Sequence, residues 1–289
     1  MKRAYITFAD GELYESLAGV LDESIMMFSE YPLIIYRKYD LGLNADDDLS
    51  KSGYKYKLLA CLKSLELYDE VVWLDTDCLV TNNIDKIWFE SWRIEDYPLL
   101  PKHRFFNSVI WLANRPNYND PNFIKPAKDR VGITEHSFEN VYLQACFMFF
   151  NKECRIFFEE AISYYDGYDP NVFQFGDETI LNCMIWKRFG SNLGSVFLCS
   201  CYHSPDFLES VIKTKNRDEY KSLFDRSVFN TGYGYYTWSE HMSSDRSNPF
   251  PLPILENNFE NIMFFHGSKD PILHRHYLSC MKENRKRAF

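Results

Sequence analysis

A run of four apolar residues, Val71 to Leu74, constrains the fold of this 289-residue chain more than any other feature. Successive side chains of a strand point to opposite faces, so a continuously apolar strand is buried on both sides. Strands of this kind belong to largely parallel sheets whose two faces are covered by helices. The run therefore predicts an α/β fold.

The segments around this run alternate between strand-like and helix-like patterns, which indicates a mostly parallel central sheet flanked by helices. Further strands are expected at residues 3–8, 32–36 and 144–151, and within "GSVFLCS" and "ENIMFFHG". Helices are expected at residues 14–28, 54–67, 154–165 and 177–188. The chain shows no internal repeat, and a single domain over residues 1–289 is predicted.

Composition excludes several classes of partner. A net charge of −9 argues against nucleic acid, whose phosphate backbone is held by a surplus of Lys and Arg. No stretch approaches the ~20 apolar residues of a transmembrane segment, and the first residues lack the cleavage site of a signal peptide.

In a chain this long, eight cysteines without a CxxC pair do not indicate a disulfide framework. A cytoplasmic protein with reduced, mostly buried thiols is expected.

Two aspartates, Asp75 and Asp77, directly follow the apolar run. Because side chains alternate along a strand, both are expected to point the same way at the carboxyl edge of the sheet, where α/β proteins bind ligands. Two neighbouring carboxylates repel each other unless a cation lies between them, and Mg²⁺ or Mn²⁺ is the common solution. In the alternative interpretation, Asp75 caps a turn and Asp77 is solvated.

With its D-x-D after an apolar strand, "VVWLDTD", the sequence resembles the metal-dependent glycosyltransferases of the GT-A fold. The resemblance is to the family that includes glycogenin and the bacterial lipopolysaccharide galactosyltransferases. Four further segments match that family in the same order: "YITFADGELY" (5–14), "YKYKLLACLKSL" (54–65), "FGDETILN" (175–182) and "IMFFHGSKD" (262–270). The resemblance implies one GT-A domain whose C-terminal segment, from about residue 248, returns to the active site.

The resemblance also implies roles for individual residues. It makes Asp75, Asp77 and His266 the ligands of Mn²⁺ or Mg²⁺, and Asp177 and Glu178 the catalytic pair. The residues implied at the nucleotide and its diphosphate are Thr7, Phe8, Ala9, Asp10, Tyr14, Lys57, Asp75, Gly267 and Lys269. Lys57 is alternatively a solvated helix lysine, and Lys55 could exchange roles with it.

Two departures from the family pattern concern the catalytic and C-terminal segments. Many retaining relatives have Gln where this chain has Glu178, and a carboxylate there acts as a nucleophile or as a base, so the stereochemistry is open. The family's C-terminal motif spaces its His, Gly and Lys more widely and ends in Lys-Pro-Trp, whereas this chain continues Lys-Asp-Pro after Ser268.

The implied reaction is transfer of a hexose, glucose or galactose, from a UDP-sugar to a carbohydrate, glycolipid or protein acceptor. The metal would stabilise the diphosphate leaving group. The alternatives are a phosphohydrolase of the haloacid dehalogenase type and a non-catalytic sugar-nucleotide-binding protein. The aromatic segment 229–238 is interpreted either as an acceptor-binding loop or as packing. The basic tail at residues 282–287 suggests a weak peripheral contact with anionic lipid.

Overall fold

The computed structural model describes residues 1–44, 54–88, 105–109, 121–134, 143–189, 196–200, 234–237, 262–266 and 269–287. The chain divides into two compact units. Unit 1 comprises residues 1–8, 36–73 and 92–198, and unit 2 comprises residues 9–35, 74–91 and 199–289.

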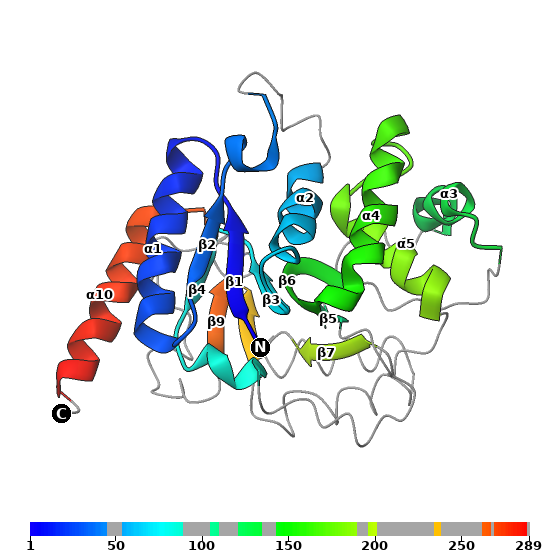
Figure 1. The fold of residues 1–289 in the computed structure, drawn as a ribbon. Helices are drawn as coiled ribbons and strands as arrows, with labels where there is room; N and C mark the ends of the chain where they lie inside the picture. Colours follow the sequence, from blue (N-terminus) through cyan, green and yellow to red (C-terminus); the bar gives the residue numbers. More distant parts are fainter. Residues whose placement is uncertain are drawn as a thin grey trace. The chain divides into compact units, whose positions relative to one another are not determined.

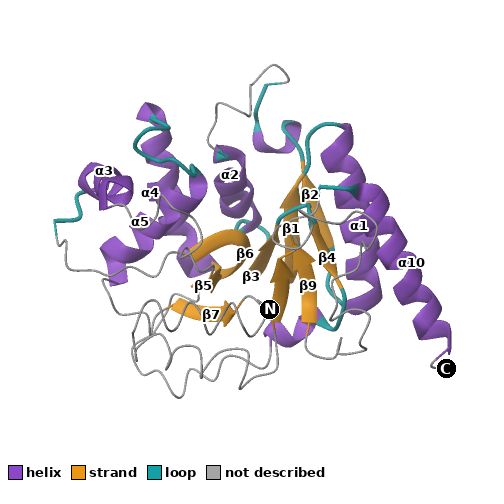
Figure 2. Ribbon diagram, turned by 180° about the vertical axis from the view of Figure 1, so that it is seen from behind, coloured by secondary structure: helices purple, strands orange, loops and turns teal. Residues whose placement is uncertain are grey.

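Unit 1 is built on a mixed sheet flanked by helices (Figure 2). Its strands lie in the order β1-β3-β6-β5-β7. They are β1 (Arg3–Phe8), β3 (Glu70–Leu74), β6 (Leu143–Asn151), β5 (Phe105–Val109) and β7 (Val196–Ser200). The boundary between the units falls within β7, after Leu198. Strand β1 pairs with β3 in parallel, and β5 pairs with β6 antiparallel. The helices are α2 (Lys55–Ser64), α3 (Pro121–Val131), α4 (Arg155–Ser163) and α5 (Asp177–Phe189). The expected α/β class is confirmed.

The core of unit 1 is dominated by aromatic side chains. All five residues of β3 are buried, as the continuous apolar run predicts. Full burial of each large apolar side chain contributes about 1.5–3 kcal/mol of transfer free energy, so these rings stabilise the sheet against its helices. Among the described residues of unit 1, the largest fully buried side chains are Tyr5, Trp73, Phe147, Phe150, Phe157, Phe158 and Phe173.

Unit 2 holds a second, three-stranded sheet in the order β4-β9-β8. Its strands are β4 (Cys78–Val80), β9 (Ile262–His266) and β8 (Gly234–Thr237), its helices are α1 (Glu12–Phe28) and α10 (Pro271–Arg287), and β2 (Leu33–Tyr36) lies at its boundary. Helix α1 packs against both β4 and α10, and α1 and α10 lie side by side in Figure 1. On its β4 side, Ser24 Oγ accepts a hydrogen bond of 3.1 Å from the Val80 N–H.

Several elements of the described chain were not predicted from the sequence: β4, β5, α3, β8 and α10. The basic tail belongs to α10, because residues 282–287 form the last turns of that helix. There Lys282 Nζ lies 2.9 Å from Glu23 Oε2 on α1. In the aromatic segment 229–238, residues Gly234–Thr237 form β8 beside β9, and the rest lies outside the described residues.

Two expectations about the whole chain can be compared with the described residues. None of the described helices is long and apolar enough to cross a membrane. Five of the cysteines are buried thiols outside any disulfide, as expected: Cys61, Cys78, Cys146, Cys154 and Cys183. Burial raises the pKa of the Cys183 thiol to about 12, so this thiol stays protonated and unreactive at neutral pH.

Candidate functional site

The two aspartates of the D-x-D motif lie in a turn of unit 2. Strand β3 ends at Leu74, and residues 75–77 lead into β4, with the Cys78 N–H donating to the Asp75 carbonyl oxygen at 3.0 Å. Neither residue belongs to a strand, so strand alternation does not set the direction of these two side chains. Asp77 is 9% exposed, so the alternative of a solvated Asp77 is wrong.

The backbone of His266 lies beside this turn. In the antiparallel pair of β4 and β9, His266 is the partner of Cys78, which directly follows Asp77. Paired residues of antiparallel strands have Cα atoms about 4.5–5.5 Å apart. Two carboxylates and an imidazole are a donor set that suits Mn²⁺. Where side chains are described, no three His, Cys, Asp or Glu are grouped as metal ligands; the His266 side chain and Gly267 lie outside that description.

Tyr14 and Lys269, both proposed at the nucleotide, lie together in unit 2. Lys269 Nζ is 6.0 Å from the centroid of the Tyr14 ring, which is 38% exposed. Ala9 is fully buried and Asp10 is half-buried, just before α1. An exposed aromatic face with an ammonium group over it offers a surface for a base next to a positive charge for a phosphate.

The segment after Lys269, which differs from the motif of the resembled family, begins a helix. Asp270 Oδ1 accepts a hydrogen bond of 2.9 Å from the Ile272 N–H, and Pro271 is the first residue of α10. Aspartate at the N-cap followed by proline at the first helical position is a favoured helix start. The Asp-Pro pair therefore begins α10 directly after Lys269.

The remaining nucleotide-site candidates lie at the end of β1 in unit 1. Thr7 is fully buried, and its Oγ1 has no hydrogen-bond partner in the described part of the chain. Phe8 stacks on Tyr56 of α2, with ring centroids 4.2 Å apart. A buried hydroxyl without a partner costs stability, so a polar ligand atom at this strand end would satisfy it.

Unit 1 brings Lys57 and Asp177 together in a buried ion pair. Lys57 Nζ lies 3.3 Å from Asp177 Oδ2, and the two side chains are only 9% and 4% exposed. The same ammonium donates to the Ala145 carbonyl oxygen at 3.0 Å and lies 5.3 Å from the centroid of the Trp73 ring. The alternative of a solvated Lys57 is wrong, and Lys57 holds the first acid of the proposed catalytic pair in place.

Glu178 is fixed by the same residue of β6. The Ala145 N–H donates to Glu178 Oε2 at 3.1 Å. The backbone N–H and carbonyl oxygen of Ala145 therefore bond to the side chains of Glu178 and Lys57, respectively. The register of β5 and β6 explains why the N–H and carbonyl oxygen of Ala145 can bond to side chains. It shifts from Asn107 opposite Met148 to Ser108 opposite Gln144, so residues 145–147 form a bulge in β6. Such bulges occur often beside active sites.

Two tyrosines, Tyr165 and Tyr168, lie near enough to Asp177 to feel its charge. The pKa values of Tyr165 and Tyr168 are both raised. In each case burial is the largest cause and the negative charge of Asp177 is the second. The rings of Tyr165 and Tyr168 are stacked at 5.2 Å, and Lys55 Nζ lies 6.0 Å from the Tyr165 centroid. Lys55 thus lies over a tyrosine, whereas Lys57 pairs with Asp177.

Sequence reasoning missed Ala145 and the tyrosines. Ala145 acts through its backbone, which no residue type reveals, and its only signal is its place in an expected strand. The segment "YYDGY" (164–168) is conspicuous for its three tyrosines, but nothing in the sequence connects it with Asp177.

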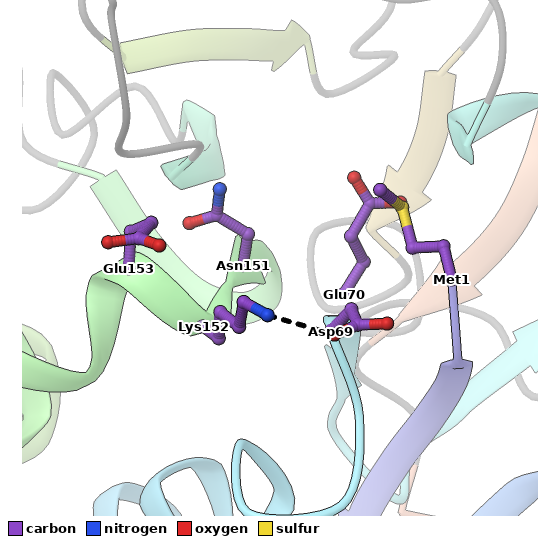
Figure 3. Close-up of a pocket in the computed structure, with 6 residues that line it drawn as sticks. All are labelled: Met1, Asp69, Glu70, Asn151, Lys152 and Glu153. Carbon is purple, nitrogen blue, oxygen red and sulfur yellow. Dashed lines mark hydrogen bonds and ion pairs between the residues drawn. The ribbon is translucent and has the colours of Figure 1, made fainter.

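A surface pocket of about 510 Å³ lies elsewhere in unit 1 (Figure 3). It is lined by Met1, Asp69, Glu70, Asn151, Lys152 and Glu153, around the starts of β1 and β3 and the end of β6. Asp69 accepts hydrogen bonds from the Lys2 N–H at 2.8 Å and from Lys152 Nζ at 3.2 Å, and these two bonds lower the pKa of Asp69, the first of them most. The pocket contains none of the predicted site residues, and the hydrogen bond from the Lys2 N–H joins the amino end of β1 to the start of β3.

Comparison with solved structures shows what the chain is similar to; no family model and no curated protein matches the sequence. A glycosyltransferase involved in the glycosylation of the major capsid of PBCV-1 is 9% identical, over 97% of this chain and 100% of that chain, with a TM-score of 0.45. The galactosyltransferase LgtC, in complex with donor and acceptor sugar analogs, is 14% identical, over 96% of this chain and 95% of that chain, with a TM-score of 0.47. The chain is thus similar to solved glycosyltransferases, but at values too low to carry a functional argument.

Proposed function

We propose that the chain is a GT-A-type glycosyltransferase that transfers a hexose, glucose or galactose, from a UDP-sugar to an acceptor with the help of Mn²⁺ or Mg²⁺. The observation that carries the proposal is the pairing of β4 with β9, which brings the backbone of His266 beside Asp77 although the two are far apart in sequence. If "IMFFHGSKD" corresponds to the family's metal-binding motif, His266 must lie beside the turn that holds Asp75 and Asp77. The support for the proposal thus comes from a strand pairing within this chain.

In unit 2, the proposed roles concern the nucleotide and its diphosphate. Asp75, Asp77 and His266 would hold the cation, which stabilises the negative charge that develops on the leaving diphosphate. Lys269 adds a compact positive charge for a phosphate, and the exposed face of Tyr14 stacks on the base. Gly267, which lacks a Cβ, allows the backbone to approach the diphosphate closely.

In unit 1, the proposed roles concern the sugar. Lys57 holds Asp177 in place through the ion pair, so that this carboxylate can accept hydrogen bonds from sugar hydroxyls. The Ala145 N–H orients Glu178, whose carboxylate acts at the reacting carbon as a nucleophile or a base. The ion pair thus makes Lys57 a positioning residue for Asp177.

A panel of nucleotide sugars tests the reaction class. Incubation with UDP-glucose and UDP-galactose should release UDP in the presence of Mn²⁺ and stop when EDTA is added. GDP- and CMP-linked sugars are the matched controls and should be inert. A phosphohydrolase would instead release inorganic phosphate from p-nitrophenyl phosphate, and that result without any UDP release would contradict the proposal.

Conservative changes to the acid pair separate sugar chemistry from nucleotide binding. Asp177→Asn and Glu178→Gln should each lower transfer at least about tenfold and leave the affinity for UDP within about twofold, because both carboxylates are proposed to act on the sugar. Turnover and UDP calorimetry on the same preparations provide the measurement. Asp166→Asn, at an exposed position of the same unit, is the control. Loss of UDP binding in either variant, with the fold intact, would remove these residues from the sugar site.

A further inference from the structure

Tyr54, at the start of α2, has an unusual backbone conformation. It is the only residue other than glycine in the described part of the chain with a positive φ, at φ 63° and ψ 24°. It occupies the N-cap position of α2 without a side-chain capping hydrogen bond, and it is 52% exposed.

This position contradicts three local preferences. The left-handed conformation favours Gly or Asn, the N-cap favours Ser, Thr, Asp or Asn, and a large aromatic ring is favoured in the core. An asparagine would satisfy the first two preferences at once. Local rules that fail together at one residue point to a functional role for its side chain.

The surroundings of Tyr54 connect it to the proposed sugar site within unit 1. Its ring lies 5.9 Å from that of Tyr56 in an edge-to-face arrangement. Burial, then Asp177, and then Tyr54 raise the pKa of Tyr168, so Tyr54 and Asp177 both lie near the Tyr168 phenol. Exposure falls from 52% at Tyr54, through half-buried Tyr56 and Tyr168, to 3% at Asp177.

We propose that Tyr54, supported by Tyr56 and Tyr168, is the platform on which a pyranose ring of a carbohydrate acceptor stacks. The inference rests on the proposed function, because it takes Asp177 as the residue that meets the donor hexose. The donor sugar must reach the buried acid, so the aromatic faces farther towards solvent are left for the second substrate. The exposed aromatic ring offers an apolar face to the C–H groups of a sugar, and the tyrosine hydroxyls can bond to its hydroxyl groups.

Two disaccharides, maltose and lactose, are suitable probes, because they present a glucose and a galactose residue at their non-reducing ends. Saturation-transfer NMR on the full chain, without nucleotide, should detect binding of at least one of them at millimolar concentration. Tyr54→Phe, which keeps the ring, should bind within about threefold of the wild-type chain. Tyr54→Asn, which removes the ring and suits the left-handed backbone, should weaken binding at least about tenfold.

The matched control is Tyr39→Asn, which removes a 91% exposed tyrosine from the same unit and should leave binding unchanged. The melting temperature of Tyr54→Asn should equal or exceed that of the wild-type chain, because the substitution relieves backbone strain. Absence of binding to both disaccharides, equal binding by Tyr54→Asn, or a lower melting temperature of Tyr54→Asn would each overturn the proposal. The disaccharide assay contains no nucleotide and the donor panel contains no disaccharide, so failure of the platform is distinguishable from failure of the proposed reaction.

Discussion

Replacing Lys57 by methionine should lower the free energy of unfolding by about 3–5 kcal/mol, the usual cost of removing one partner from a buried ion pair. Lys57 and Asp177 are 9% and 4% exposed, so the Asp177 carboxylate would stay buried without the neighbouring ammonium. The substitution also removes the hydrogen bond to the Ala145 carbonyl oxygen. Urea denaturation of both chains provides the measurement.

The controls for this prediction come from the same helix and the same pair. Lys63→Met, at an exposed position of α2, should cost less than about 1 kcal/mol. The double variant Lys57→Met with Asp177→Leu should recover most of the lost stability, because it leaves no buried charge. If Lys57→Met costs no more than Lys63→Met, the ion pair does not stabilise unit 1.

Replacing Asp77 by asparagine should lower sugar transfer by roughly 10²-fold or more, which is the effect of losing a key electrostatic stabiliser. Asparagine preserves the shape of the side chain and removes its charge. The metal-free melting temperature should stay level or rise, because one of two neighbouring carboxylates is gone, and the stabilisation that added Mn²⁺ confers should shrink. Turnover assays and thermal melts with and without Mn²⁺ check both parts.

A purely structural role for Asp77 predicts the opposite pattern. Loss of a turn-capping carboxylate would cost about 1 kcal/mol of metal-free stability and leave turnover almost unchanged. A variant that melts early and transfers sugar at the wild-type rate would therefore remove Asp77 from the proposed metal site.

The elements that the sequence predicted correctly are those with a strong local pattern. Strand β3 is continuously apolar and buried throughout, and α1 has apolar residues at helical spacing along 17 residues. Helix α10 was missed because residues 282–287 are mostly charged and resemble a solvated tail. Its buried side chains, His274, Tyr277 and Leu278, lie earlier in the helix.

The contacts between the candidate site residues could not be predicted from the sequence. The sequence indicated that Lys57 and Asp177 matter, but a lysine on a helix is usually solvated, and its partner lies 120 positions away. The bulge that opens Ala145 depends on the pairing of β5 with β6, and two strands can pair in several registers. The turn at residues 75–77 depends on β4, which is only three residues long and has no alternating pattern.

Calorimetry of UDP binding with and without a divalent cation tests the central claim most directly. The proposal places Asp75, Asp77 and His266 on a cation that bridges the protein to the diphosphate, so UDP should bind in Mn²⁺ and lose at least about tenfold in affinity in excess EDTA. The Asp77→Asn variant should bind UDP weakly under both conditions. Equal affinity of the wild-type chain for UDP in Mn²⁺ and in EDTA would contradict the metal bridge.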